Sequence, residues 1–170
     1  VRTFSILTGY VATTLRNYWQ VIADGAYFPR YQSDNLTRGG PLMESQAAWN
    51  SSASISSRPG ARTRWRVAFS MSRDELGGWG VTPNAGFSFR PGSQWEVSID
   101  PRFSKGETSR QYIGTLSGGS AATYGGRYIF SRLDRTEASA RIRVNYAITP
   151  DLTLETDAEP FASSGRVFEF

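Results

Sequence analysis

The stretch that decides the fold is Gln94-Trp95-Glu96-Val97-Ser98-Ile99-Asp100-Pro101-Arg102-Phe103-Ser104, in which polar and apolar residues alternate without exception. A period of two places successive side chains on opposite faces of a β-strand. The same alternation returns at 64–72, 138–149 and 152–159, and in weaker form at 19–28, 49–57 and 85–90. We therefore expect a sheet with one apolar and one polar face.

The links between these strands indicate how the sheet is connected. Three further segments look like strands by composition, at 3–14, 110–117 and 127–133, which brings the expected number to about ten strands, each near the 9–11 residues of a membrane strand. Short links, two of them with the Pro-Gly pair of tight turns, lie at 15–17, 58–61, 90–93 and 149–151. Longer polar links lie between them, at 29–47, 73–83, 104–110 and 134–137. The link 118–126 falls among the short ones by parity, although it is long for a turn.

The composition excludes several kinds of site. The 170 residues include no Cys and no His, so disulfides, thiolate nucleophiles, Cys-based zinc sites and Ser-His-Asp catalysis are excluded. The 19 basic residues, all arginine except Lys105, are scattered from Arg2 to Arg166 among 15 acidic residues. A nucleic-acid-binding protein clusters its basic residues on one face or in one run, so we expect no nucleic-acid partner.

Membrane insertion through strands fits the sequence better than insertion through a helix. No stretch approaches 18 uninterrupted apolar residues, and no signal peptide is visible at Val1. Alternating short and long links are typical of outer-membrane barrels, in which apolar residues face lipid and polar residues face the lumen. We expect residues 1–170 to form a single all-β region, an antiparallel up-and-down transmembrane β-barrel or a large part of one, that is a piece of a larger chain.

Two groups of residues are candidates for functional positions in such a barrel. Charged side chains that would face the lumen and pair across it are Arg64, Arg66, Glu96, Asp100, Arg102, Arg141, Arg143, Glu155 and Asp157. Aromatic side chains that would form girdles at the two membrane interfaces are Tyr18, Trp19, Trp49, Trp65, Trp95 and Phe103. Aromatic residues that fill the core of a soluble β-sandwich are the alternative interpretation.

Other chemistry has weaker support. A pair of carboxylates, such as Glu96 with Asp100 or Glu155 with Asp157, could carry acid–base catalysis without histidine, but ion pairs with arginine are the simpler interpretation. The loop 33–40 offers oxygen ligands for calcium, although a structured turn explains its composition equally. The sequence therefore predicts no catalytic residue, no metal site and no cofactor.

Several segments together resemble the C-terminal region of a bacterial protein family of unknown function. The segments are Leu36-Thr37-Arg38-Gly39-Gly40-Pro41-Leu42-Met43 followed by Trp49, Phe89-Arg90-Pro91-Gly92, Gln111-Tyr112-Ile113, Arg127-Tyr128-Ile129-Phe130-Ser131-Arg132-Leu133-Asp134, Arg143-Val144-Asn145-Tyr146, Ile148-Thr149-Pro150-Asp151-Leu152-Thr153-Leu154 and Glu159-Pro160-Phe161-Ala162-Ser163-Ser164-Gly165. Members of this family join an N-terminal carbohydrate-binding-like β-sandwich to a large outer-membrane barrel. The resemblance implies a barrel whose sequence continues in both directions.

The leading hypothesis is a non-enzymatic, porin-like β-barrel of the bacterial outer membrane, serving transport, surface binding or envelope assembly. Its expected partners are the lipid bilayer and, beyond it, other envelope proteins or surface glycans. A soluble β-sandwich or lipocalin-like barrel that binds an apolar ligand is one alternative. A structural barrel subunit that docks onto partner proteins in a larger envelope complex is the other.

Overall fold

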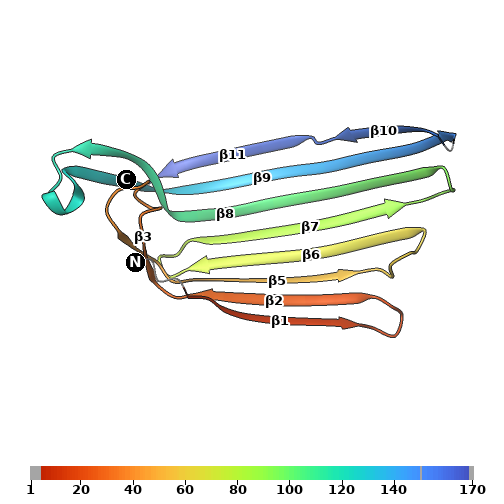
Figure 1. Cartoon of the computed structure of the whole chain (residues 1–170), viewed down its shortest axis with the longest axis horizontal. Coiled ribbons are helices and arrows are strands. Elements are labelled where there is room, and N and C mark those ends of the chain that lie inside the picture. The colour runs from red at the N-terminus through yellow and green to blue at the C-terminus, as the bar shows by residue number, and fades with distance from the viewer. Residues whose placement is uncertain (1–4, 150, 169–170) are drawn as a thin grey trace.

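The chain folds into one long antiparallel sheet and a small hairpin, with no α-helix among the described residues (Figure 1). The computed structural model describes residues 5–149 and 151–168. Its strands are β1 (Leu7–Thr14), β2 (Gln20–Phe28), β3 (Tyr31–Ser33), β4 (Met43–Ser45), β5 (Ala48–Ser56), β6 (Thr63–Asp74), β7 (Trp79–Phe89), β8 (Trp95–Ser117), β9 (Gly126–Thr149), β10 (Leu152–Ala158) and β11 (Phe161–Phe168). A 3-10 turn, η1 (Ala121–Thr123), precedes β9. No helix in the described part is long and apolar enough to cross a membrane.

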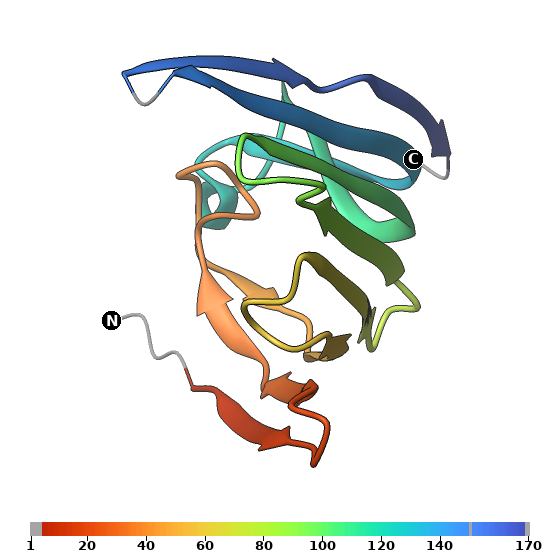
Figure 2. The ribbon, with the colours of Figure 1, turned by 90° about the vertical axis from the view of Figure 1, so that its right-hand side faces the viewer.

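The large sheet has the order β1-β2-β5-β6-β7-β8-β9, and β10 and β11 both pair with β9 at its outer edge. Neighbouring strands are antiparallel and follow the chain, except that the β3–β4 hairpin is inserted between β2 and β5. The sheet curves but does not close, so that β1 and the β10–β11 side are two separate edges (Figure 2). The all-β, antiparallel expectation is therefore confirmed at the level of an open sheet.

The two C-terminal segments form one interrupted edge strand. Ala158 lies opposite Ile142 and Phe161 opposite Ser139, so no residue is inserted across the break. The N–H of Ala140 donates to the carbonyl of Pro160 at 3.1 Å, which bridges the interruption. The Ser- and Gly-rich segment 162–165 therefore continues this strand, because such a segment after a proline is tolerated at a sheet edge.

The predicted links 104–110 and 134–137 are also wrong. Both lie inside the long strands β8 and β9, where Ser104 pairs with Glu137 and Glu107 with Asp134. Their polar composition resembles a loop, but their backbones pair with each other in the sheet. The ten expected strands therefore occupy eight positions in the sheet, because β8 and β9 each combine two of them. With this order the link 118–126 lies at the same end as the other long loops, as its length requires.

The turns and loops separate to opposite ends of the sheet (Figure 1). The short turns between β1 and β2, β5 and β6, β7 and β8, and β9 and β10 lie at one end, which we call the short-turn end. At the other end, the loop end, lie the segment 29–47, the turn 75–78 and the tip 118–125. The expected long link 73–83 is shorter than predicted because β6 and β7 extend into it. Residues 3, 4 and 150, which belong to an expected strand and an expected turn, lie outside the described residues.

Two internal prolines interrupt the sheet near its middle. Pro83 lies on β7 and Pro101 on β8, and the pairing between these strands is interrupted on both sides of Asn84 and Arg102. Proline has no N–H to donate to a neighbouring strand. β7 pairs continuously with β6, and β8 pairs continuously with β9 over the same rows. These outer pairings keep the register across the interruption.

Candidate functional site: the two faces of the sheet

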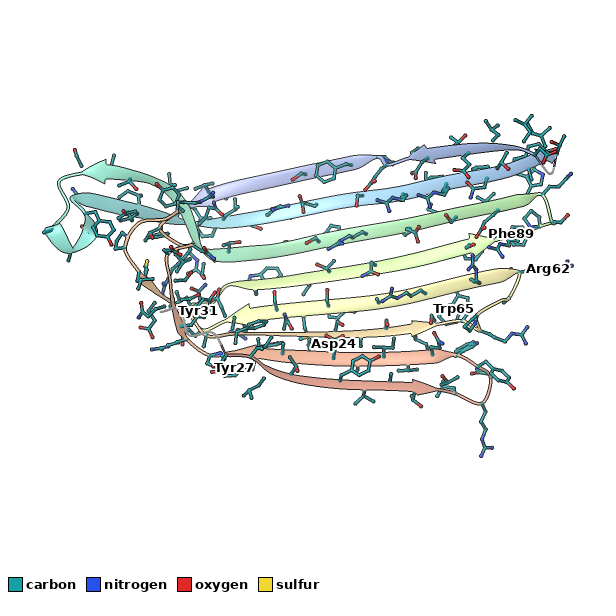
Figure 3. All side chains as sticks on the ribbon, viewed as in Figure 1. Asp24, Tyr27, Tyr31, Arg62, Trp65 and Phe89 are labelled. Carbon is teal, nitrogen blue, oxygen red and sulfur yellow. The ribbon has the colours of Figure 1, made fainter. Side chains whose placement is uncertain are left out.

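The register of the strands separates an apolar face from a polar face across the whole sheet. Trp65 pairs with Phe87, which pairs with Ile99, which pairs with Ile142. On the opposite face, Arg64 pairs with Ser88, and Ser98 pairs with Arg143. Figure 3 shows side chains projecting from both faces along the full length of the strands. The alternation at 64–72, 94–104 and 138–149 therefore predicted correctly which residues of these segments share a face.

The apolar face is uncovered. Among the described residues Ala68 is the only buried apolar side chain, whereas Val67 and Phe69 on either side of it are 52% and 45% exposed. The chain exposes 11526 Å² in total, compared with roughly 8,300 Å² expected for a compact monomer of this mass. The apolar stripes thus do not form a core within this chain.

The polar face is hollowed. Three hollows lie along it, with volumes of about 420, 400 and 280 Å³ from the loop end to the short-turn end. The middle hollow is lined mainly by small polar residues, among them Asn50, Ser52, Ser70, Thr82 and Ser104. It shares Ser72, Gly80 and Ser104 with the hollow at the loop end. The polar face is therefore concave, and we call these hollows together the trough.

All nine charged residues predicted to face a lumen lie on this polar face. The register places them in rows across β6, β8, β9 and β10. Three arginine–carboxylate pairs form within the open sheet rather than across a lumen: Arg64 with Glu96 at 2.6 Å, Arg143 with Asp157 at 2.7 Å and Arg141 with Glu159 at 3.0 Å. Because these pairs are partly exposed, each contributes little to stability. The carboxylates considered for acid–base catalysis thus contact guanidinium groups or, like Glu155, stand apart.

The predicted girdle aromatics lie on the apolar face, with one exception. The rings of Trp19 and Trp65 contact each other edge to face with their centroids 4.9 Å apart, and Trp95 stacks on Tyr146 with a centroid distance of 4.2 Å. Both pairs lie at the short-turn end. Trp49 and Phe103 lie on the same face, nearer the loop end, and are 38% and 40% exposed. The exception, Tyr18, belongs to the β1–β2 turn, where its φ of 63° is left-handed.

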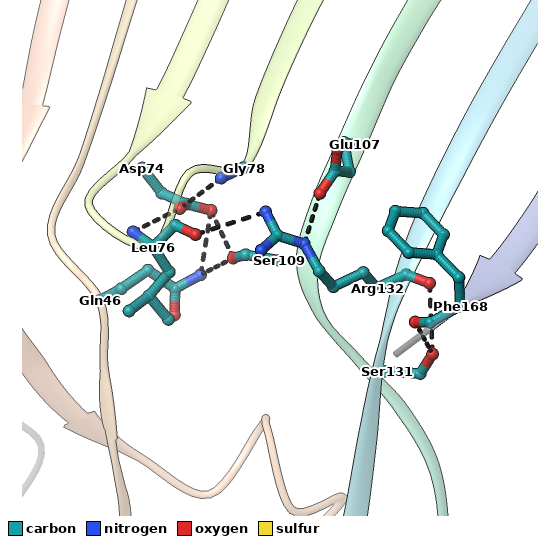
Figure 4. Close-up of polar contacts among 9 residues, drawn as sticks. All are labelled: Gln46, Asp74, Leu76, Gly78, Glu107, Ser109, Ser131, Arg132 and Phe168. Carbon is teal, nitrogen blue, oxygen red and sulfur yellow. Dashed lines mark hydrogen bonds and ion pairs between the residues drawn. The ribbon is translucent and has the colours of Figure 1, made fainter. Parts of the chain in front are cut away.

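A network that the sequence did not reveal holds the loop end together (Figure 4). The carboxylate of Asp74 accepts hydrogen bonds from the N–H groups of Leu76 and Gly78 at 2.9 and 2.8 Å, which closes the 75–78 turn. Its other oxygen accepts from Ser109 at 2.6 Å and from Gln46 at 3.4 Å. Thus one side chain joins β6, β8 and the 29–47 segment.

A second part of this network is a contact between β8, β9 and the 75–78 turn. Arg132 forms an ion pair with Glu107 and also reaches the carbonyl of Leu76 at 3.5 Å. These residues lie in or beside segments that the sequence predicted to be loops. The register places Glu107 opposite Asp134, so complementary charge could not have predicted the pairing of these segments from the sequence.

The 29–47 segment packs on the part of β8 and β9 that projects beyond the other strands. Arg38 lies over the ring of Tyr112 at 5.7 Å, and Gly40 contacts Tyr128 so closely that a Cβ there would lie 2.3 Å from its hydroxyl. The hydroxyl of Thr37 donates to the carbonyls of Asp34 and Pro41. These bonds make 33–40 a structured turn, and the described residues contain no cluster of three or more carboxylates that could hold a metal ion.

Three of the segments that carry the family resemblance meet at this end. The loop 36–43 contacts the strand segments 111–113 and 127–134, which are far away in the sequence. Comparison of the chain with protein-family models, with curated proteins and with solved structures finds no match. The resemblance therefore stays a prediction.

Proposed function

We propose that this sheet is the wall of a non-enzymatic β-barrel in the bacterial outer membrane, with its apolar face on lipid and its trough facing water. The observation that carries this proposal is the continuous, uncovered apolar face, which lies opposite the hollowed polar face. A soluble protein rarely leaves a large apolar surface exposed. In a barrel wall the same surface is covered by lipid tails.

The height of the apolar face supports a lipid contact. It extends from Trp95 to Phe103 on β8 and from Trp79 to Phe89 on β7. At about 3.4 Å per residue these distances are about 27 and 34 Å along the strands. Tilting the strands by about 40° would give roughly 21–26 Å across the bilayer, close to the roughly 25 Å apolar band of membrane barrels.

The limits of the apolar face along the strands also support its placement in the hydrocarbon region of a membrane. On β8 the apolar positions are followed by Lys105 and Glu107, which pair with Thr136 and Asp134. Charged side chains on the lipid side of a barrel belong outside the hydrocarbon region. The part of β8 and β9 beyond Lys105, with the docked 29–47 segment, would therefore stand above the membrane, and the aromatic residues at both limits would lie at the interfaces.

Among the roles open to such a wall, the trough favours passage of polar solutes. Its hollows follow one another along the polar face and are lined by hydroxyl, amide and charged groups. The docked loops at the loop end would suit contacts with envelope proteins or surface glycans. A structural subunit whose apolar face docks on partner proteins is the second candidate, because the same exposed surface could be covered by protein.

Single cysteines test the proposal, because the chain has no cysteine of its own. Phe69→Cys, Val97→Cys and Ile142→Cys probe the apolar face, and Ser70→Cys, Ser98→Cys and Arg141→Cys probe the polar face. In native outer membranes we expect the first set to react only with a membrane-soluble maleimide and the second set with a water-soluble one. Apolar-face cysteines that are protected from both reagents would instead place protein over that face and favour the docking subunit.

A further inference from the structure

The hollow at the short-turn end of the trough has an unusual lining. It has a volume of about 280 Å³, and two guanidinium groups, Arg64 and Arg66, lie in its wall. The hydroxyl groups of Ser56, Ser88 and Ser98 lie beside them. The wall is therefore rich in hydrogen-bond donors.

These donors outnumber the acceptors that the protein supplies. Among the described residues Arg66 makes no hydrogen bond or ion pair. The residues opposite it on the neighbouring strands, Ser56 and Gly86, are small. Arg64 uses one terminal nitrogen for Ser88 and Glu96, and its Nε is buried without an acceptor. Arg66, which is exposed in the wall of the hollow, therefore keeps its donors available for a ligand or water.

One carboxylate, Asp100, also belongs to the lining. It lies over Gly86, where a Cβ would come within 2.7 Å of its oxygen. Glycine at this position leaves room for the carboxylate, which forms no ion pair in the described part of the chain. Arg64 also pairs with Glu96, which in turn pairs with Arg90, so the hollow and its edge carry three guanidinium groups against two carboxylates.

The wider charge distribution adds to this local excess. The rows of the polar face toward the short-turn end, with their turns, carry nine arginines: Arg16, Arg58, Arg62, Arg64, Arg66, Arg90, Arg102, Arg141 and Arg143. The same region carries six carboxylates: Glu96, Asp100, Asp151, Glu155, Asp157 and Glu159. Toward the loop end the order reverses, because Asp24, Asp74 and Glu137 outnumber Arg135. The potential along the trough therefore becomes more positive toward the hollow.

We propose that this hollow is a binding site for an oxyanion, the phosphate or carboxylate group of a small solute. The planar guanidinium of Arg66 offers paired N–H donors that match two oxygens of such a group. The serine hydroxyls supply further donors to its remaining oxygens. The site depends on the geometry of the polar face alone and does not require the sheet to lie in a membrane.

Titration of the full folded chain in detergent micelles with inorganic phosphate, and separately with acetate, followed by calorimetry, tests this site. We expect saturable binding that becomes at least tenfold weaker in Arg66→Gln. Arg135→Gln, which removes an arginine of the same face at the loop end, is the matched control and should bind as the native chain does. Asp100→Asn should bind more tightly, because it removes the one negative charge of the lining.

The outcomes separate the proposal from its rivals. Absence of saturable binding, or equal weakening by Arg66→Gln and Arg135→Gln, would overturn the site. Tighter binding of phosphate than of acetate would identify a dianion site, and equal binding a carboxylate site. If Arg66→Gln does not fold, as judged by circular dichroism, Arg66→Lys keeps the charge without the planar donor pair and should bind with intermediate affinity. Cysteine labelling in membranes reports on the barrel wall independently of all these results.

Discussion

At the scale of single residues, the contact between Arg30 and Glu75 attaches the 29–47 segment to the β6–β7 turn. Arg30 donates to one carboxylate oxygen of Glu75 at 2.8 and 3.0 Å, and the N–H of Ala47 donates to the other at 3.1 Å. The hydrogen bond from Arg30 lowers the pKa of Glu75 below its ordinary value of 4.5. The stabilisation is therefore fully present above pH 4.5 and is lost as the pH falls through the lowered pKa.

This contact makes a local prediction. We expect the amide of Ala47 to lose protection against hydrogen exchange once the pH falls below the pKa of Glu75. Protection here means the exchange rate corrected for the intrinsic rate at each pH, compared with its value at neutral pH. Glu75→Gln removes the charge and should show the faster exchange at every pH, after correction for intrinsic rates. An Ala47 amide whose protection does not depend on pH in the native chain would show that this carboxylate does not hold the segment.

At the scale of elements, glycines on β8 show where the strands fit closely. A Cβ on Gly106 would lie 2.5 Å from the carbonyl oxygen of Trp79 and 2.9 Å from the Cα of Gly80, both backbone atoms of β7. We expect Gly106→Ala to destabilise the fold by about 1–3 kcal/mol, because the backbone cannot yield as a side chain can. Gly114→Ala on the same strand meets nothing within 4 Å and is the matched control. Urea unfolding in micelles measures both, and equal effects would contradict the close contact.

The same elements show how much of the fold could be predicted from sequence. Alternation identified the strands and their faces, because it reports the unlike surroundings of the two sides. It failed inside β8 and β9, where Lys105 and Glu107 interrupt the apolar stripe although the backbone pairing continues. The network of Asp74, Gln46 and Ser109 could not be predicted, because its members come from three distant segments and become neighbours only through the register. The free Arg66 likewise follows from three-dimensional geometry, since the sequence shows only that arginines and carboxylates share a face.

At the scale of the whole molecule, the two faces of the sheet should respond differently to a new charge. Phe69 and Ser70 are adjacent on β6, near the middle of the sheet, but they lie on the apolar and the polar face respectively. If lipid covers the apolar face, Phe69→Arg places a guanidinium in hydrocarbon and should cost about 2–4 kcal/mol of folding stability in liposomes. Ser70→Arg points into the trough, where the middle hollow gives it water and space, and should cost less than about 1 kcal/mol. Reversible unfolding from liposomes by guanidinium chloride measures this difference. Equal costs for the two substitutions would mean that the apolar face does not lie against lipid, and the exposed stripes would then have to be covered by another protein.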